Sequence, residues 1–104
     1  MKDGEISASR AEELAKNMKK EDFHFIEGYV GRGYALSRPE ELEHIKRMAR
    51  MEGVVFDPVY TGKATFGMVN EMKAGGMLER SKNILFIHTG GLYGLFPVSR
   101  DFDF

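Results

Sequence analysis

Three short segments of this sequence combine hydroxyl or basic side chains with glycines. They are residues 31–34 (GRGY), 60–63 (YTGK) and 88–91 (HTGG). Tyrosine and threonine hydroxyls can donate or accept hydrogen bonds, and a tyrosine can act as an acid or base when its pKa is shifted. The glycines allow the backbone to pass close to a flat or anionic ligand. The three segments therefore form a candidate ligand site, in which a tyrosine can serve as an acid–base group or simply as a hydrogen-bond donor.

Each segment also has a purely structural interpretation. Thr61 can cap a helix while Tyr60 packs as an aromatic ring, and for that segment alone this is the commoner outcome. HTGG can be a tight turn that needs positive φ angles. Arg32 can grip a carboxylate or lie on the surface. Lys63, in the first turn of a predicted helix, is more often solvated or paired than catalytic, so we do not assign it a catalytic role.

The sequence gives little support to metal or dinucleotide binding. The histidines His24, His44 and His88 have neither i, i+2 nor i, i+4 spacing, and there is no cysteine. We therefore assign no metal site, and we expect His44 to be solvated on a charged helix face. No G-x-G-x-x-G joins a strand to a helix and no Walker loop is present, which disfavours a nicotinamide or flavin site.

Three helices and three strands are predicted to position these segments. In chain order they are a helix over residues 8–20, a strand over 23–30, a helix ending at Gly53, a strand over 54–56, a helix over 62–76 and a strand over 83–88. Such alternation is typical of parallel strands joined by crossover helices. We therefore expect an α/β fold, a three-layer α/β/α arrangement around a small parallel sheet, with the chemical segments along one edge.

The boundaries and buried faces of the helices follow from local signals. Ser37 and Glu40 form a candidate capping box, with Pro39 in the first turn. Thr61 is the candidate cap of the third predicted helix. The side chains expected to pack on the sheet are Leu42, Ile45, Met48 and Ala49 in one helix and Phe66, Val69 and Met72 in the next.

Composition narrows the class of protein. The chain has 104 residues, of which 42% are hydrophobic and 30% are charged, as expected for one globular domain. The formal net charge is -1, so no long-range field favours nucleic acid or an acidic membrane. The apolar runs are too short to span a bilayer, and no signal peptide is recognisable. We expect a cytoplasmic protein that binds neither nucleic acid nor membranes.

Taken together, the motifs are more specific than any one alone. GRGYALSRPEELEHIKRMARMEGVVFDPVYTGKATFGMV, followed by NILFIHTGG, resembles the C-terminal part of the 1-aminocyclopropane-1-carboxylate deaminase and D-cysteine desulfhydrase family. That family consists of fold type II pyridoxal-phosphate enzymes with a tryptophan synthase β-like fold. The resemblance implies that residues 1–104 form one α/β fragment of the large domain. Within it we expect a peripheral N-terminal helix, a family-matching core and a tail, over residues 1–22, 23–96 and 97–104.

The resemblance implies roles for individual residues. Tyr60 and Tyr34 match two catalytic tyrosines that face the cofactor and substrate from opposite sides. Thr61 and Thr89 match positions beside the pyridine nitrogen of the cofactor. The remaining cofactor-binding positions are the glycines that pass close to its ring, Gly90 and Gly91.

Thr61 bears on the reaction that the resemblance implies. Deaminase members resemble DPVYEGK at this point, where a glutamate can keep the pyridine nitrogen protonated, whereas a threonine carries no charge. The threonine favours the desulfhydrase branch, which converts D-cysteine to pyruvate, hydrogen sulfide and ammonia. The alternative within the family is 1-aminocyclopropane-1-carboxylate deaminase.

Essential parts of the family have no counterpart in this sequence. The lysine that attaches the cofactor, the loop that holds the substrate carboxylate and the phosphate-binding loop lie in the family's N-terminal part. The resemblance therefore implies a fragment, inactive by itself, of an enzyme that acts on a small amino-acid substrate. Because three predicted strands leave two sheet edges uncovered, we expect association with the missing N-terminal part or with another copy in a homo-oligomer. The competing interpretations are a non-catalytic α/β domain that binds a partner and a small ligand-binding domain.

Overall fold

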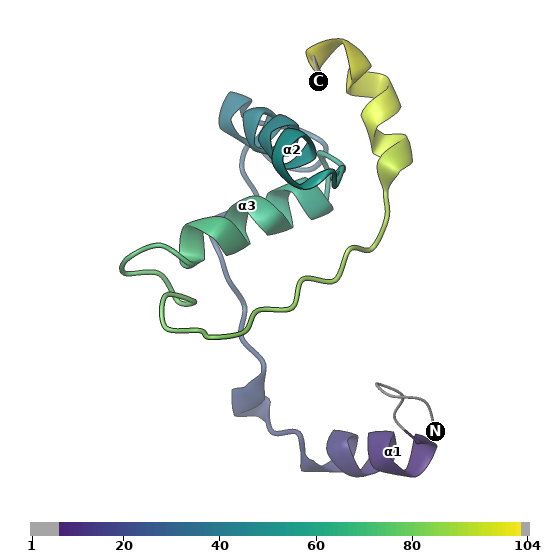
Figure 1. Cartoon of the computed structure of the whole chain (residues 1–104), viewed down its shortest axis with the longest axis vertical. Coiled ribbons are helices and arrows are strands. Elements are labelled where there is room, and N and C mark those ends of the chain that lie inside the picture. The colour runs from purple at the N-terminus through teal and green to yellow at the C-terminus, as the bar shows by residue number, and fades with distance from the viewer. Residues whose placement is uncertain (1–6, 103–104) are drawn as a thin grey trace.

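Helices and extended segments make up the computed structural model, which describes residues 7–102 (Figure 1). The α-helices are α1 (Ala8–Asn17), α2 (Pro39–Glu52) and α3 (Thr61–Glu71), and the 3₁₀ segments are η1 (Lys20–Asp22) and η2 (Leu92–Asp101). The radius of gyration is 16.6 Å. A compact domain of this length has a value of about 13 Å. Much of the chain therefore extends away from its packed centre.

Helix α2 begins and ends at residues that its flanking sequence explains. Pro39 is its first residue, and a residue before proline is forced into an extended conformation, so Arg38 becomes the N-cap. The Arg38 N–H donates to Oε2 of Glu41 at 3.2 Å. The predicted Ser37–Glu40 capping box is therefore wrong by one residue. The predicted end at Gly53 is confirmed, since Gly53 adopts a left-handed conformation and its N–H donates to the Ala49 carbonyl.

The packed centre lies where α2 meets α3. Ile45 of α2 is 0% exposed. Gly62, in the first turn of α3, allows the two helices to approach closely, because a Cβ there would lie 2.6 Å from Cδ1 of Ile45. Phe56, in the connection between the helices, is also buried and packs edge-on against Phe86. The core of the described residues is consequently small.

The predicted sheet is wrong, because the structure has no strand between residues 7 and 102. Residues 54–56 and 86–88 do approach each other, but side chains join them. The Phe56 ring lies against Phe86 and stacks on His88, and His88 Nε2 bonds the Val55 carbonyl. A strand requires a ladder of backbone hydrogen bonds. Apolar and β-branched residues favour extended backbone, but they do not supply a neighbouring strand for that ladder. The three-layer α/β/α prediction therefore fails.

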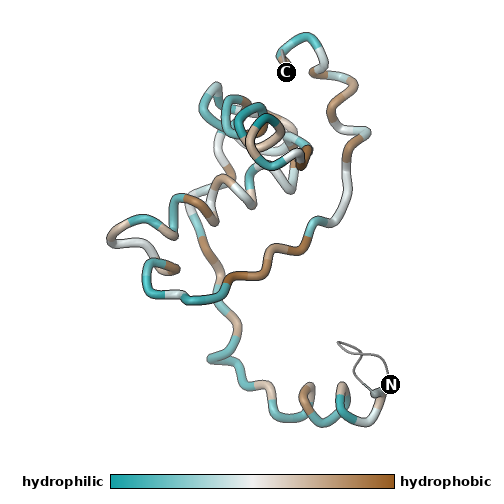
Figure 2. The backbone as a smooth tube through the Cα atoms, in the orientation of Figure 1, coloured by the Kyte–Doolittle hydropathy of each residue, from teal (hydrophilic) through white to brown (hydrophobic). Residues whose placement is uncertain are grey.

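Two apolar segments that were predicted as strands lie open as extended arms, residues 23–28 and 83–88. Phe25 is 90% exposed in the first arm and Leu85 is 87% exposed in the second. Figure 2 shows hydrophobic residues along these extended lengths of chain, outside the helices. Neither arm has the covering layer that the sheet prediction assumed.

Several side chains differ from the expected pattern for the same reason. Phe66 and Val69 are only half-buried and Met72 is exposed, because no sheet lies beneath α3. Helix α1 buries none of its residues. His44, expected to be solvated, is half-buried against α3, where its Nε2 lies 3.1 Å from the Thr65 hydroxyl. Within residues 7–102 no helix is long and apolar enough to cross a membrane.

Candidate functional site

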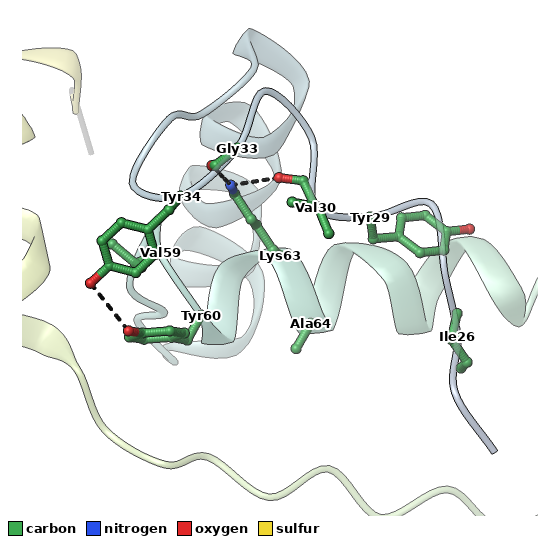
Figure 3. A pocket seen from close by; sticks show the side chains of 9 residues that line it. All are labelled: Ile26, Tyr29, Val30, Gly33, Tyr34, Val59, Tyr60, Lys63 and Ala64. Atoms are coloured by element: carbon green, nitrogen blue, oxygen red, sulfur yellow. Dashed lines mark hydrogen bonds between the residues drawn. The ribbon is translucent and has the colours of Figure 1, made fainter.

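The two tyrosines that the sequence singled out lie together. Tyr60 is the residue before the first turn of α3, and Tyr34 lies in the GRGY turn. The Tyr60 hydroxyl donates to the Tyr34 hydroxyl at 3.3 Å, and the ring centroids are 6.2 Å apart. Both rings are largely exposed, so the paired hydroxyls are open to a ligand (Figure 3). The structure thus unites GRGY and YTGK.

Lys63 fixes the GRGY turn against α3. Its Nζ donates to the carbonyls of Val30 and Gly33, each at 2.8 Å, and its side chain is buried (Figure 3). These contacts hold the segment that carries Tyr34 over the start of the helix. Lys63 thus acts as a structural clamp held by two backbone carbonyls, where the sequence favoured a solvated or carboxylate-paired lysine.

A groove of about 390 Å³ surrounds the tyrosine pair. Its walls are mainly apolar, and the side chains with polar groups are three tyrosines, Tyr29, Tyr34 and Tyr60, and Lys63. No carboxylate lines it. Apolar walls with a few polar groups are typical of small-molecule sites. The lining residues are Ile26, Tyr29, Val30, Gly33, Tyr34, Val59, Tyr60, Lys63 and Ala64.

A buried carboxylate, that of Asp57, builds the turn that carries Tyr60. Its Oδ2 accepts from the backbone N–H groups of Val59 and Tyr60, at 2.8 and 2.7 Å. Its Oδ1 accepts from the Thr61 N–H and the Thr61 hydroxyl, at 2.9 and 2.5 Å. Burial raises the pKa of the Asp57 carboxyl, but the hydrogen bonds from Thr61, Tyr60 and Val59 outweigh it, and the pKa lies below its usual value.

Thr61 does not reach the groove in this structure. It is 3% exposed, and its hydroxyl is engaged by Asp57 on both sides, since it also accepts from the Asp57 N–H at 2.9 Å. The expectation that Thr61 bonds a cofactor nitrogen remains a prediction. In the chain itself, the hydroxyl closes the turn before α3.

The HTGG segment passes beside the same turn. His88 Nε2 bonds the Val55 carbonyl at 2.8 Å, and the Gly90 N–H donates to His88 Nδ1 at 3.0 Å. A Cβ on Gly91 would lie 2.8 Å from Oδ1 of Asp57, so glycine is needed for this close approach. Thr89 is exposed and does not line the tyrosine groove. HTGG therefore meets YTGK through Asp57 and lies outside the groove.

The electrostatics favour a neutral phenol at Tyr60. Its hydrogen bond to Tyr34, interaction with that phenol, burial and the nearby Asp57 charge all raise the pKa of Tyr60 above its ordinary value. At neutral pH Tyr60 is therefore a proton donor. Arg32, a candidate for holding a carboxylate, is exposed in the GRGY turn.

Two residues of this region were missed by sequence reasoning. Asp57 had a recognisable signal, because an aspartate just before a helix start often bonds the following N–H groups through its side chain. His88 had no such signal, since its stacking on Phe56 depends on a contact between distant segments. Across the part of the chain described, no group of three or more histidine, cysteine, aspartate or glutamate residues could hold a metal ion.

Comparison with known proteins identifies the family. The family model described as pyridoxal-phosphate dependent enzyme matches residues 2–90. The chain is 43% identical over 83 residues to the Arabidopsis thaliana bifunctional D-cysteine desulfhydrase/1-aminocyclopropane-1-carboxylate deaminase, mitochondrial, covering 80% of this chain and 21% of that protein. It is 41% identical over 92 residues to a putative 1-aminocyclopropane-1-carboxylate deaminase of Thermotoga maritima, covering 88% and 28%.

A third relative is the D-cysteine desulfhydrase of Salmonella typhi, 40% identical over 79 residues, covering 72% of this chain and 23% of the relative. No solved structure matches. The chain thus spans about a quarter of the length of these relatives. It belongs to the pyridoxal-phosphate-dependent enzyme family, as a fragment of its 1-aminocyclopropane-1-carboxylate deaminase and D-cysteine desulfhydrase members.

Proposed function

We propose that this chain supplies the tyrosine-bearing part of a pyridoxal-phosphate site that eliminates hydrogen sulfide from D-cysteine. The rest of the site comes from the portion of the family polypeptide that the chain does not match. The observation that carries the proposal is the Tyr34–Tyr60 pair, two hydroxyls 3.3 Å apart in an open groove. The resemblance assigns catalytic roles to these same two residues.

The residues present fit one side of the cofactor. Phenol hydroxyls and an apolar wall suit its ring and the bound substrate, and Gly90 leaves open space where a side chain would otherwise stand. Lys63 is not available to attach the cofactor covalently, because its Nζ is engaged by two backbone carbonyls. The cofactor, when bound, draws electrons from the substrate's α-carbon into its pyridine ring. The lysine that attaches the cofactor therefore belongs to the unmatched portion of the family polypeptide, which we call the complementary portion or complement.

The tyrosine pair can deliver a proton to a leaving group. When the carbon–sulfur bond of the substrate breaks, the electron pair leaves on sulfur. Tyr34 accepts a hydrogen bond from Tyr60, so its own proton is free to be donated outward, to that sulfur. Tyr60 can then pass its proton to the Tyr34 oxygen and, being exposed, take one from water. The raised pKa of Tyr60 keeps its phenol protonated at neutral pH before this step.

The identity of residue 61 supports D-cysteine as the substrate. The Thr61 hydroxyl donates to Asp57 within the turn before α3. Threonine is the residue that the resemblance associates with desulfhydration, whereas deaminase members resemble DPVYEGK. The second candidate is the deaminase reaction on 1-aminocyclopropane-1-carboxylate, which the names of the Arabidopsis and Thermotoga relatives favour.

The extended arms support the proposed complementary portion. Phe25, Leu85 and Ile87 expose most of their side chains, and such apolar surface is characteristic of an interaction site. The relatives carry about three quarters of their length outside the matched region. We therefore propose that this unmatched portion, rather than a second copy of this chain, covers the exposed side chains of the arms. The cytoplasmic location expected from the sequence stays a prediction.

Reconstitution tests the proposed function. The chain is mixed with the unmatched portion of the Thermotoga maritima relative and pyridoxal phosphate, and pyruvate release from D-cysteine is measured beside 2-oxobutanoate release from the cyclopropane substrate. We expect pyruvate from the mixture and none from the chain alone. Dominant 2-oxobutanoate release would replace the proposal with the deaminase reaction. No turnover from a mixture that forms a stable complex would favour a non-catalytic binding protein.

A chemical control accompanies this assay. The chain alone is incubated with pyridoxal phosphate, reduced with borohydride and analysed by mass spectrometry. Because Lys63 is clamped by Val30 and Gly33, we expect no stoichiometric adduct on it. An adduct on Lys63 would contradict the roles assigned to the groove. Light scattering of each sample shows whether the chain pairs with the complement or with itself.

A further inference from the structure

Asp57 stands out among the residues that the proposed chemistry does not use. It is 1% exposed, yet it lies between the two segments singled out by their chemistry. A buried carboxylate is costly unless hydrogen bonds satisfy it. Here four donors, three backbone N–H groups and one hydroxyl, occupy its two oxygens. All four are neutral, so the charge is held by oriented dipoles at the start of α3.

The Asp57 carboxylate lies against the backbone at two places, Tyr60 and Gly91. Through Oδ2 it holds the N–H of Tyr60, the residue whose side chain meets Tyr34. Through Oδ1 it holds Thr61 and lies where a Cβ of Gly91 would stand. A displacement of this carboxylate therefore moves the backbone of Tyr60, and the close approach of Gly91 depends on where the carboxylate lies.

We propose that Asp57 is a positioning residue for the tyrosine pair, acting by fixing the backbone of Tyr60 and the approach of HTGG to it. It does not touch the substrate, because it does not line the groove. Its effect on turnover passes through the placement of the Tyr60 hydroxyl. This inference deepens the proposed function and rests on the role of Tyr60 there.

The direct test uses the four tyrosines of the chain, labelled with ¹³C at Cζ. In Asp57→Asn the side-chain NH₂ replaces an acceptor, so two of the four donors face a donor. We expect the resonances of Tyr60 and Tyr34 to shift and that of Tyr29, whose hydroxyl donates to Glu71, to stay. Unmoved Tyr60 and Tyr34 resonances in a folded variant would overturn the proposal. This measurement needs neither cofactor nor complement, so it stands apart from the proposed function.

A second pair of variants guards against unfolding of Asp57→Asn. Thr61→Val keeps the shape of the side chain but removes the hydroxyl that donates to Asp57, whereas Thr61→Ser retains it. We expect Val to shift the Tyr60 resonance and Ser to leave it near the parent position. Equal shifts in both variants, or no shift in either, would show that the carboxylate's hydrogen bonds do not place Tyr60.

Turnover by the reconstituted enzyme supplies an independent readout. A misplaced catalytic group reduces turnover by about 10- to 100-fold, so kcat of Asp57→Asn should fall by that factor. KM should change by less than about twofold, since groove contacts are kept. A rise in KM with unchanged kcat would contradict the positioning role and assign Asp57 to ligand binding.

Discussion

The helix pair, residues 29–71, and the extended arms, residues 23–28 and 83–88, are both rich in apolar residues but differ in what those residues contact. In the helix pair, Ile45 is fully buried and even the charged Asp57 and Lys63 have hydrogen-bond partners within the chain. In the arms, Phe25 and Leu85 lie almost fully exposed. The first region buries a core of its own, to which Phe86 and His88 of the second arm add contacts with Phe56. The exposed side chains of the arms present a surface that the chain itself does not cover.

The largest effect is expected from a cavity in the helix pair. Ile45→Ala removes a fully buried side chain that fits against Gly62, so the free energy of unfolding should fall by about 2–5 kcal/mol. Leu85→Ala in the isolated chain is the matched control and should cost less than about 0.5 kcal/mol. Urea unfolding followed by circular dichroism measures both. Equal losses of unfolding free energy in the two variants would contradict the distinction between the helix pair and the arms.

The arms should matter when the complement binds. Burying a leucine or phenylalanine side chain contributes about 1.5–3 kcal/mol, so Leu85→Ala or Phe25→Ala should weaken binding of the complementary portion by about 10- to 100-fold. Titration calorimetry measures the change. Glu12→Ala, on the exposed helix α1, serves as the control. Parent affinity in both arm variants would show that the complement binds elsewhere.

Acid should weaken the helix pair through Asp57. Its folded pKa lies below the ordinary 3.8, so its contribution to stability is present above that value and is lost as pH falls through the folded pKa. The stability difference between the parent and Asp57→Asn should therefore shrink as pH is lowered from about 5 to about 3. Urea unfolding at each pH measures it. A constant difference would mean that the carboxylate charge is not what stabilises the turn.

A smaller pH effect is expected at the contact between the helices. Burial, then the charges of Arg47 and Lys73, lower the pKa of His44 below 6.5. The unfolded chain then binds a proton first as pH falls, so stability decreases from about pH 7 through 6.5 until the folded pKa is passed. His44→Gln retains a donor for Thr65 but cannot titrate, and its stability should vary less over this range. Identical pH profiles of stability in the parent and in His44→Gln would show that His44 is not the source of this pH effect.

The sequence predicted the local features of the helix pair well and the long-range ones poorly. Pro39 and Gly53 mark the limits of α2 because cap geometry depends only on neighbouring residues. The resemblance assigned Tyr34 and Tyr60 to one site but to opposite sides of the cofactor, whereas their hydroxyls lie 3.3 Å apart in the structure. The sheet expected to bring the two segments together is absent from residues 7–102.

The arms show why the remainder could not be predicted. A run such as NILFIH favours extended backbone through its side chains. Whether a strand lies beside it depends on residues far away in the sequence or on a partner chain. Asp57 gave a signal at its own turn, whereas its contact with Gly91 joins segments far apart in sequence. Local propensity therefore located the α-helices, whereas the three predicted strands, which need partners distant in sequence, are absent from residues 7–102.

Turnover of D-cysteine by the reconstituted enzyme carrying Tyr60→Phe tests the central claim most directly. This variant keeps the ring and removes only the hydroxyl bonded to Tyr34. Tyr93→Phe is the matched control, because Tyr93 is exposed in η2, outside the groove. We predict that Tyr60→Phe lowers kcat by about 100-fold with cofactor still bound, while Tyr93→Phe keeps the parent rate. Parent turnover in Tyr60→Phe would show that the tyrosine pair only packs.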